Sequence, residues 1–226
     1  NIKMINSILF FGRTNCKFSL KIKNFLKKKI KKVDIVLSDN EKQINIKRYL
    51  KKNYDFIFCF RSKLILKKNI LKKSKFCINF HPSLPKYRGV GGVNYALYNN
   101  DKFFGLTVHI MNEKIDNGKI LYVDKFKIKK NENINSLLNK THKKMYEKFI
   151  EIINKIHKEE LFIKYLIKNK VKYKWSKNYN NLNDLDKFYE IKINETKKNF
   201  IKKIRSTVTD YYKPYIKLHK KKFYLF

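Results

Sequence analysis

The sequence contains little alanine, glycine, proline or arginine. It has one alanine (Ala96), six glycines, three prolines and five arginines among 226 residues, and it shows no internal repeat. No apolar run reaches the roughly 18 residues that a transmembrane helix needs. The apolar stretch from Ile8 to Phe11 is too short for the core of a secretory signal. We therefore expect a soluble, cytoplasmic protein without a membrane partner.

Cysteine is also scarce. Cys16, Cys59 and Cys77 are widely spaced, form no CxxC pair and lie near no histidine cluster. This spacing predicts neither a disulfide framework nor a metal site, and it fits free thiols in a reducing compartment. Cys59 and Cys77 lie within apolar runs, so we expect both in the core.

Positively charged residues are abundant in the sequence. The formal net charge is +37, while hydrophobic residues still make up 43% of the chain, enough for a folded core. Two interpretations of the charge stay open. A cationic surface attracts phosphates and would bind nucleic acid. Alternatively, the charge reflects nucleotide bias, because lysine replaces arginine throughout and the abundant residues all have AT-rich codons. Either way, a positive field would help to capture an anionic substrate.

Short apolar segments alternate with helical patterns along the first two thirds of the chain. Strands are expected at 7–11, 33–37, 55–60, 76–80, 103–111 and 120–128, and helices at 18–29, 64–73, 93–100 and 134–158. Asn133 or Asn135 is the expected N-cap of the last helix. The pattern predicts an α/β fold, a Rossmann-like open, mostly parallel sheet with flanking helices.

The regular alternation is lost after about residue 160. A helix at 195–205 and a hairpin formed by 215–218 and 222–226 are expected there. We therefore divide the chain into a main domain, residues 1–160, and a short C-terminal α+β extension, residues 161–226, packed against it.

One segment, from Asn79 to Gly118, contains the polar side chains that are candidates for catalysis. Asn79 and His81 are two residues apart in an expected strand, so their side chains point to the same side. Pro82 ends that strand, and the C-terminal strand ends of an open parallel sheet face the ligand crevice. Asp116 lies in a turn between two later strands, where Gly118 permits a tight backbone.

These residue types suit direct acyl transfer between two bound substrates. Ser83 lies in a proline-flanked turn without the glycines of a nucleophile elbow, and one His with one Asp is too few for zinc. Asn and His N–H groups can stabilise an oxyanion, while a carboxylate favours imidazolium and accepts the proton of an attacking amine. In the alternative interpretation, Asn79 only caps backbone groups and Asp116 belongs to an ordinary hairpin turn.

Two stretches carry a family resemblance: INFHPSLPKYRGVGGVNYALYN and FGLTVHIMNEKIDNGKIL. Together they resemble the signature of the folate-dependent formyltransferases, Asn-x-His-Pro-Ser-Leu-Leu-Pro followed by an Asp-x-Gly turn. This family includes glycinamide ribonucleotide transformylase, methionyl-tRNA formyltransferase and the sugar N-formyltransferases. By position, the catalytic Asn, His and Asp of the family fall on Asn79, His81 and Asp116. The chain has one leucine fewer than the pattern, so the loop differs in length while the three residues are kept.

The resemblance implies 10-formyltetrahydrofolate as the formyl donor, with residues 1–160 as the catalytic domain. In the family the pterin lies between the segment before the catalytic strand and the loop that bears the Asp. The corresponding residues here are Phe60, Leu64, Ile65, Leu66, Met111, Ile115 and Gly118, and a core role for Leu64 and Leu66 stays open. No metal is implied.

Three formyl acceptors stay open: glycinamide ribonucleotide, methionyl-tRNA and a nucleotide-linked amino sugar. The short tail after the long helix is similar to that of the sugar N-formyltransferases, which we therefore favour, and lysines at the cleft rim would suit the substrate's diphosphate. Trp175, Tyr211 or Tyr212 either stacks on the sugar or base, or packs the tail against the main domain. An exposed aromatic tail would also suit a homodimer. The non-enzymatic alternative is a basic nucleic-acid-binding domain on the same fold.

Overall fold

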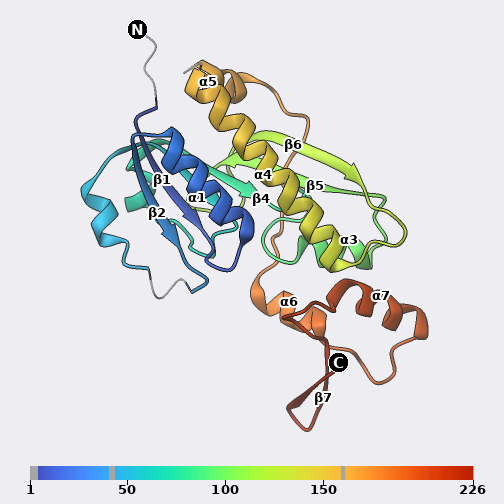
Figure 1. Ribbon diagram of the computed structural model, residues 1–226. Helices are drawn as coiled ribbons and strands as arrows, with labels where there is room; N and C mark the ends of the chain where they lie inside the picture. Colours follow the sequence, from blue (N-terminus) through green and yellow to red (C-terminus); the bar gives the residue numbers. More distant parts are fainter. Residues whose placement is uncertain (1–4, 41–43, 159–160, 226) are drawn as a thin grey trace.

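The computed structural model describes residues 5–40, 44–158 and 161–225. The centre of the fold is a 6-stranded sheet in the order β2-β1-β3-β4-β5-β6 (Figure 1). Its strands are β1 (Ser7–Gly12), β2 (Lys32–Leu37), β3 (Tyr54–Phe60), β4 (Ser74–His81), β5 (Phe103–Ile110) and β6 (Ile120–Lys127). Strands β2, β1, β3 and β4 pair in parallel, whereas β5 and β6 are antiparallel to their neighbours. The predicted Rossmann-like, mostly parallel sheet is confirmed.

Both faces of the sheet are covered, because successive side chains of a strand point to opposite sides. Along β1, Ile8 and Phe10 belong to one buried cluster, with α1 (Lys17–Lys29), α4 (Ile134–Lys158) and α5 (Leu161–Lys168). Leu9 and Phe11 belong to the opposite cluster, with the 3-10 helix η2 (Lys47–Lys51) and α2 (Lys68–Leu71). Double coverage explains why these strands appear in the sequence as continuous apolar runs.

A third cluster lies where the antiparallel strands meet α3 (Gly92–Tyr98) and the start of α4. It contains Leu97, Phe104, Phe126 and Leu137. The side-chain oxygen of Asn133 accepts a hydrogen bond from the backbone N–H of Ser136 at 3.0 Å. Asn133 is therefore the N-cap of α4, as one of the two predicted alternatives stated.

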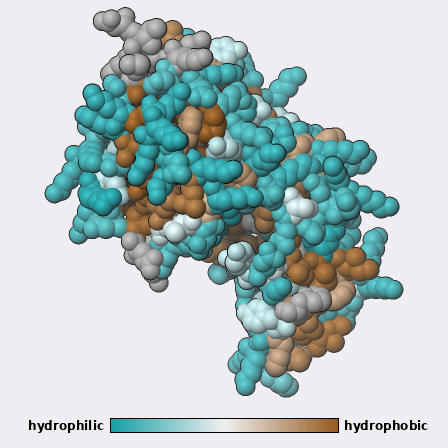
Figure 2. All heavy atoms as spheres, viewed as in Figure 1, coloured by the Kyte–Doolittle hydropathy of each residue, from teal (hydrophilic) through white to brown (hydrophobic). Residues whose placement is uncertain are grey.

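The C-terminal elements are α6 (Leu182–Tyr189), α7 (Lys197–Thr207) and the hairpin of β7 (Tyr215–Leu218) and β8 (Lys221–Tyr224). They lie beside α3, at the end of the molecule shown in orange and red in Figure 1. Asn94 of α3 donates to the carbonyl of Ser206 at 2.7 Å, which ties α7 to the sheet-bearing part of the chain. In Figure 2, hydrophilic residues cover most of the visible face, and brown residues gather over this end.

One predicted helix was inaccurate, and some helices were not predicted. The helix expected at 64–73 is only α2, because Arg61 has a φ of 57° and the N–H of Leu64 bonds to the Ser62 hydroxyl, which stops helix formation there. Helices α5 and α6 were not predicted. The expected hairpin forms, although Phe226 lies outside the described residues. None of the helices described is long and apolar enough to cross a membrane.

Candidate active site

The end of β4 places two polar side chains beside each other. Asn79 and His81 are on the same side of the strand, and the antiparallel register sets Asn79 opposite His109 of β5. His81 is buried, with 4% of its surface exposed, whereas Asn79 is half-buried. The amide nitrogen of Asn79 lies 3.1 Å from Nε2 of His109. The strand pairing therefore brings a second histidine into the site.

Asp116 reaches this group from the loop between β5 and β6. Its backbone has a φ of 38°, a left-handed conformation that is strained for a residue with a side chain. A Cβ on Gly118 would lie 1.7 Å from the carbonyl oxygen of Ile110, so only glycine fits there. The guanidinium of Arg88 donates to the carbonyl of Ile115 at 2.7 Å. These contacts fix the loop in the shape that points Asp116 inward.

The carboxylate of Asp116 is the centre of the cluster. Its Oδ2 lies 3.3 Å from Nδ1 of His81 and accepts the backbone N–H of Gly89 at 3.1 Å. Its Oδ1 accepts from the Asn79 amide at 3.2 Å and lies 3.3 Å from Nε2 of His109. The three predicted residues Asn79, His81 and Asp116 thus meet within hydrogen-bonding distance, and the carboxylate joins them.

The two ring nitrogens of His81 face two different acceptors. Nε2 lies 3.0 Å from the carbonyl oxygen of Tyr87, while Nδ1 lies 3.3 Å from Oδ2 of Asp116. The position of the ring is therefore set by Tyr87 on one side and by Asp116 on the other.

The surroundings of Asp116 keep it ionised. Burial by itself raises the pKa of this carboxyl group. Interactions with His81 and His109 and the hydrogen bond from the Gly89 N–H outweigh burial, and they hold the pKa of Asp116 well below its ordinary value. The ionised carboxylate can therefore orient the two imidazoles beside it.

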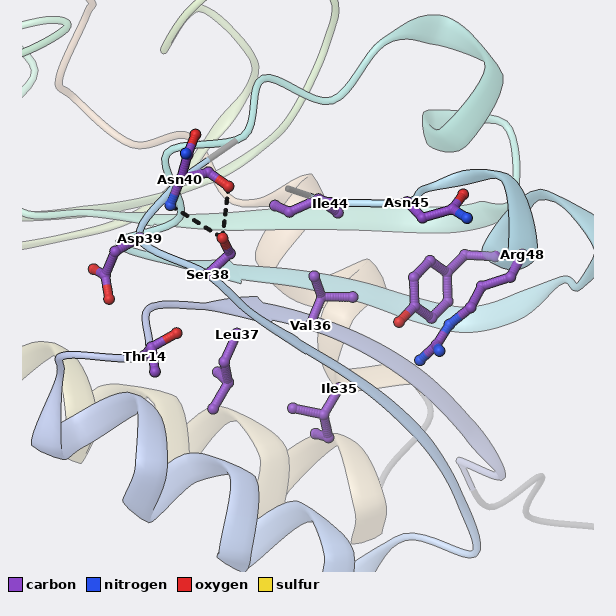
Figure 3. Close-up of a pocket in the computed structure, with 11 residues that line it drawn as sticks. Thr14, Ile35, Val36, Leu37, Ser38, Asp39, Asn40, Ile44, Asn45 and Arg48 are labelled. Carbon is purple, nitrogen blue, oxygen red and sulfur yellow. Dashed lines mark hydrogen bonds between the residues drawn. The ribbon is translucent and has the colours of Figure 1, made fainter. Parts of the chain in front are cut away.

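A hollow of about 620 Å³ lies next to the Asp116 loop, between this loop and α2. Leu71 and Met111 supply apolar surface, and Lys68, Lys72 and Lys114 supply positive charge. A different hollow, of about 590 Å³, is formed by the end of β2 and the segment that follows it. Figure 3 shows the residues that line it. Asn79, His81 and Asp116 line neither hollow, but the first is lined by Asn117, the neighbour of Asp116.

The residues predicted to hold a cofactor lie in different environments. Met111 lines the hollow beside the loop, and Ile65 is 56% exposed. Leu66 is buried in the core cluster and Leu64 packs against it. The carbonyls of Ile115 and Gly118 bind Arg88 and Trp175.

Phe60 has no exposed side chain and packs against Phe80 and Phe149. Because its ring fills the core, only the backbone of Phe60 is available to a ligand.

Sequence reasoning did not identify His109, Arg88 or Gly89 as members of the site. For Trp175 it left two alternatives open, stacking on the sugar or base and packing of the tail against the main domain, and neither named the catalytic residues as its neighbours. The indole N–H of Trp175 donates to the carbonyl of Gly118 at 2.7 Å. Its ring meets the rings of His81 and His109 edge-on, with centroid distances of 5.8 and 4.9 Å. Within the described ranges, no group of acidic, histidine and cysteine side chains is arranged to hold a metal ion.

Comparison with known proteins shows the family to which the chain belongs. The profile described as Formyl transferase matches residues 16–153. Methionyl-tRNA formyltransferase from Clostridium tetani (strain Massachusetts / E88) is 41% identical over 109 residues, which are 47% of this chain and 35% of that protein. The chain thus spans about a third of the length of such relatives, 35% in the two examples from Clostridium tetani and Ehrlichia ruminantium (strain Gardel).

Solved structures match over nearly the whole chain. A 4-N formyltransferase from Francisella tularensis has a TM-score of 0.76 at 23% identity, and the match covers 97% of this chain and 96% of that one. An N-formyltransferase from Helicobacter canadensis, solved with folinic acid and dTDP-3-aminofucose, has a TM-score of 0.71 at 20% identity, covering 96% and 86%. These structural matches establish a shared fold. The profile match spans more than half of the sequence and shows the family. The chain belongs to the formyl transferase family.

Proposed function

We propose that the protein is a folate-dependent N-formyltransferase that formylates the amine of a nucleotide-linked amino sugar, with 10-formyltetrahydrofolate as donor. The observation that carries this proposal is the Asp116 carboxylate, which lies 3.3 Å from His81 and accepts a hydrogen bond from Asn79. An amide, an imidazolium and a carboxylate in contact supply two oxyanion donors and one proton acceptor.

The hollow beside the Asp116 loop fits a folate. Folate combines a flat heteroaromatic ring with a carboxylate tail, and the hollow combines apolar Leu71 and Met111 with Lys68 and Lys72. We propose that Met111 and its neighbours contact the ring system and that the lysines attract the tail. When bound, the donor supplies the formyl group.

Each residue of the cluster has a distinct role in the proposed reaction. N–H groups of Asn79 and His81 stabilise the oxyanion that forms at the transferred carbonyl. In the structure these groups bond to Asp116, His109 and Tyr87, so the oxyanion takes the place of one of those acceptors. Asp116 pairs with His81 and takes the proton that the attacking amine loses as the new C–N bond forms. The same proton passes to the donor nitrogen when the old C–N bond breaks, so that tetrahydrofolate leaves.

The length of the structural matches supports an amino-sugar acceptor. The fold match with the Francisella tularensis 4-N formyltransferase covers 97% and 96% of the two chains. The Helicobacter canadensis enzyme was solved with an amino sugar joined to a nucleotide diphosphate. A net charge of +37 favours capture of such a diphosphate. We further propose residues 1–160 as the catalytic domain, residues 161–226 as an extension that completes it, and the cytoplasm as its compartment.

Methionyl-tRNA is the second candidate acceptor, favoured by the 41% identity to the Clostridium tetani enzyme. The deciding experiment offers the protein 10-formyltetrahydrofolate together with nucleotide-linked amino sugars, methionyl-tRNA or glycinamide ribonucleotide. Tetrahydrofolate release and acceptor mass are measured, with Asp116→Asn as the matched control. Formylation of an amino sugar supports the proposal. Formylation of tRNA alone, or no transfer to any acceptor, overturns it.

A further inference from the structure

A segment of the C-terminal part of the chain lies across the active-site loops. This strap (residues 175–181) is joined by backbone hydrogen bonds to the segment after β4: Ser176 N–H to the Pro85 carbonyl at 3.1 Å, and Asn180 N–H to the Arg88 carbonyl at 3.0 Å. The carbonyl of Asn180 in turn accepts the Val90 N–H at 3.0 Å. The strap is therefore paired with the residues that surround His81 and Asp116.

Gly89 connects the strap with the reactive carboxylate. It pairs with Asn180 in a parallel bridge, with a φ of 84°, and a Cβ at this position would lie 2.2 Å from the Asn180 carbonyl oxygen. The N–H of the same glycine donates to Oδ2 of Asp116. One residue thus contacts both the strap and the catalytic cluster, so a displacement of the strap also displaces a partner of Asp116.

Trp175 is the strap residue in closest contact with the reacting groups. Its indole N–H donates to the carbonyl of Gly118 at 2.7 Å, two residues beyond Asp116. On the other side of Asp116, Arg88 binds the Ile115 carbonyl and also the Lys177 carbonyl in the strap. The strained backbone of Asp116 is therefore held on both sides by groups that depend on the strap.

The indole ring also borders both imidazoles. Its plane is 82° from that of His109 and 66° from that of His81, an edge-to-face arrangement that aromatic rings favour. Trp175 is half-buried. The ring therefore restricts both histidines to the orientations in which they meet Asp116.

We propose that Trp175 is a positioning residue for formyl transfer, which holds the Asp116 loop and the two imidazoles in the reactive arrangement. This inference rests on the proposed function. Misplacing a catalytic group by about 1 Å costs on the order of 10²-fold in rate. Trp175→Ala should lower kcat by a factor of about that size. Trp175→Phe keeps a ring but loses the Gly118 hydrogen bond, so it should lower kcat roughly tenfold. The KM for donor and acceptor should change less than kcat.

A second measurement does not require turnover. The titratable or charged groups facing the Asp116 carboxylate are His81 on β4, His109 on β5 and Arg88, which bonds to the preceding carbonyl. Loosening the loop weakens the first two interactions, so the pKa of the Asp116 carboxyl should rise in Trp175→Ala. Carbon-13 NMR of the carboxyl groups, with Asp116→Asn for assignment, records this titration midpoint. Tyr173→Ala, two residues away and exposed, is the control for a general disturbance of the segment.

The outcomes separate this inference from the proposed function. A raised titration midpoint of the Asp116 carboxyl group in Trp175→Ala, together with the wild-type midpoint in Tyr173→Ala, supports positioning by Trp175. This result does not depend on an identified acceptor. A larger loss of kcat in Trp175→Ala than in Trp175→Phe supports positioning in the active enzyme. An unchanged midpoint, or a kcat equal to wild type in both variants, overturns the inference and leaves the proposed function intact. Lack of transfer by the wild-type protein overturns the proposed function alone. Circular dichroism confirms that each variant is folded.

Discussion

The amide nitrogen of Asn79 lies 3.1 Å from Nε2 of His109, across the pairing of β4 with β5. Nδ1 of His109 is in turn 2.9 Å from the carbonyl oxygen of Ile110. In the tautomer whose proton lies on Nδ1, the ring donates to this carbonyl and Nε2 accepts from Asn79, which fixes the direction of the amide. The orientation of a proposed oxyanion donor is thus determined by a residue on the neighbouring strand.

Removing this acceptor should reduce catalysis. His109→Leu leaves one N–H of Asn79 without its partner, so kcat should fall about 10–100-fold, the cost of losing a buried hydrogen bond to a group in a charged cluster. His109→Gln, whose amide oxygen can accept from Asn79, should lose less. Steady-state kinetics at saturating donor and acceptor test both variants. Equal kcat values for the Leu and Gln variants would show that the hydrogen bond between Asn79 and His109 does not affect turnover.

Asp116→Asn and His81→Asn should leave the fold intact and reduce turnover severely. Each removes a member of the His81–Asp116 pair, whose Nδ1 and Oδ2 atoms lie 3.3 Å apart, and general acid–base groups contribute roughly 10²–10⁴-fold in rate. Single-turnover measurements with saturating donor isolate the chemical step. Circular dichroism serves as the folding control. Near-normal rates in either variant would contradict the roles assigned here.

Asp116 should also affect the pH dependence of folding. Its pKa is depressed in the folded protein, so its ionisation stabilises the fold at neutral pH. That contribution is lost as the pH falls below the unfolded value of about 3.9 toward the lower folded pKa, at up to about 1.4 kcal/mol per pH unit. Urea unfolding from pH 7 to pH 3 should show a shallower loss of stability for Asp116→Asn than for wild type. Parallel curves would contradict the depressed pKa.

Phe149 of α4 should be essential to stability. Its ring packs against those of Phe10, Phe58, Phe60 and Phe80 and has no exposed surface. Phe149→Ala should lower the free energy of unfolding by about 3–5 kcal/mol. Leu161→Ala, at a position that is 68% exposed, should change it by less than about 0.5 kcal/mol. Chemical denaturation of both variants measures the difference. Similar losses would mean that this aromatic cluster is not the main core.

The sheet could be predicted because its strands have clear apolar patterns. Residues such as Phe58 and Ile78 are completely buried, so the strands stand out between polar segments. Helix α6 has only eight residues, and its first apolar residue, Leu182, is 72% exposed. The helix begins with a capping box in which Asn181 and Asp184 exchange hydrogen bonds. Short polar motifs of this kind occur often outside helices, so no helix was predicted here.

The proposed catalytic trio was recognisable because Asn79 and His81 share a strand and the family pattern includes Asp116. His109 was not, because only the register of β4 with β5 places it opposite Asn79. Trp175 and the carbonyl of Gly118 are 57 positions apart, and no local pattern encodes their contact. Contacts that arise only from tertiary packing cannot be predicted from periodicity or motif spacing.

The strap also has a consequence for the order of events during biosynthesis. Arg88 and Lys177, which are joined by a hydrogen bond, are 89 positions apart. Chains leave the ribosome N-terminus first. A nascent polypeptide therefore holds Asn79, His81 and Asp116 well before Trp175 has been synthesised. The proposed reaction centre is assembled in two stages, and the second stage occurs only after translation has passed Trp175 and Lys177.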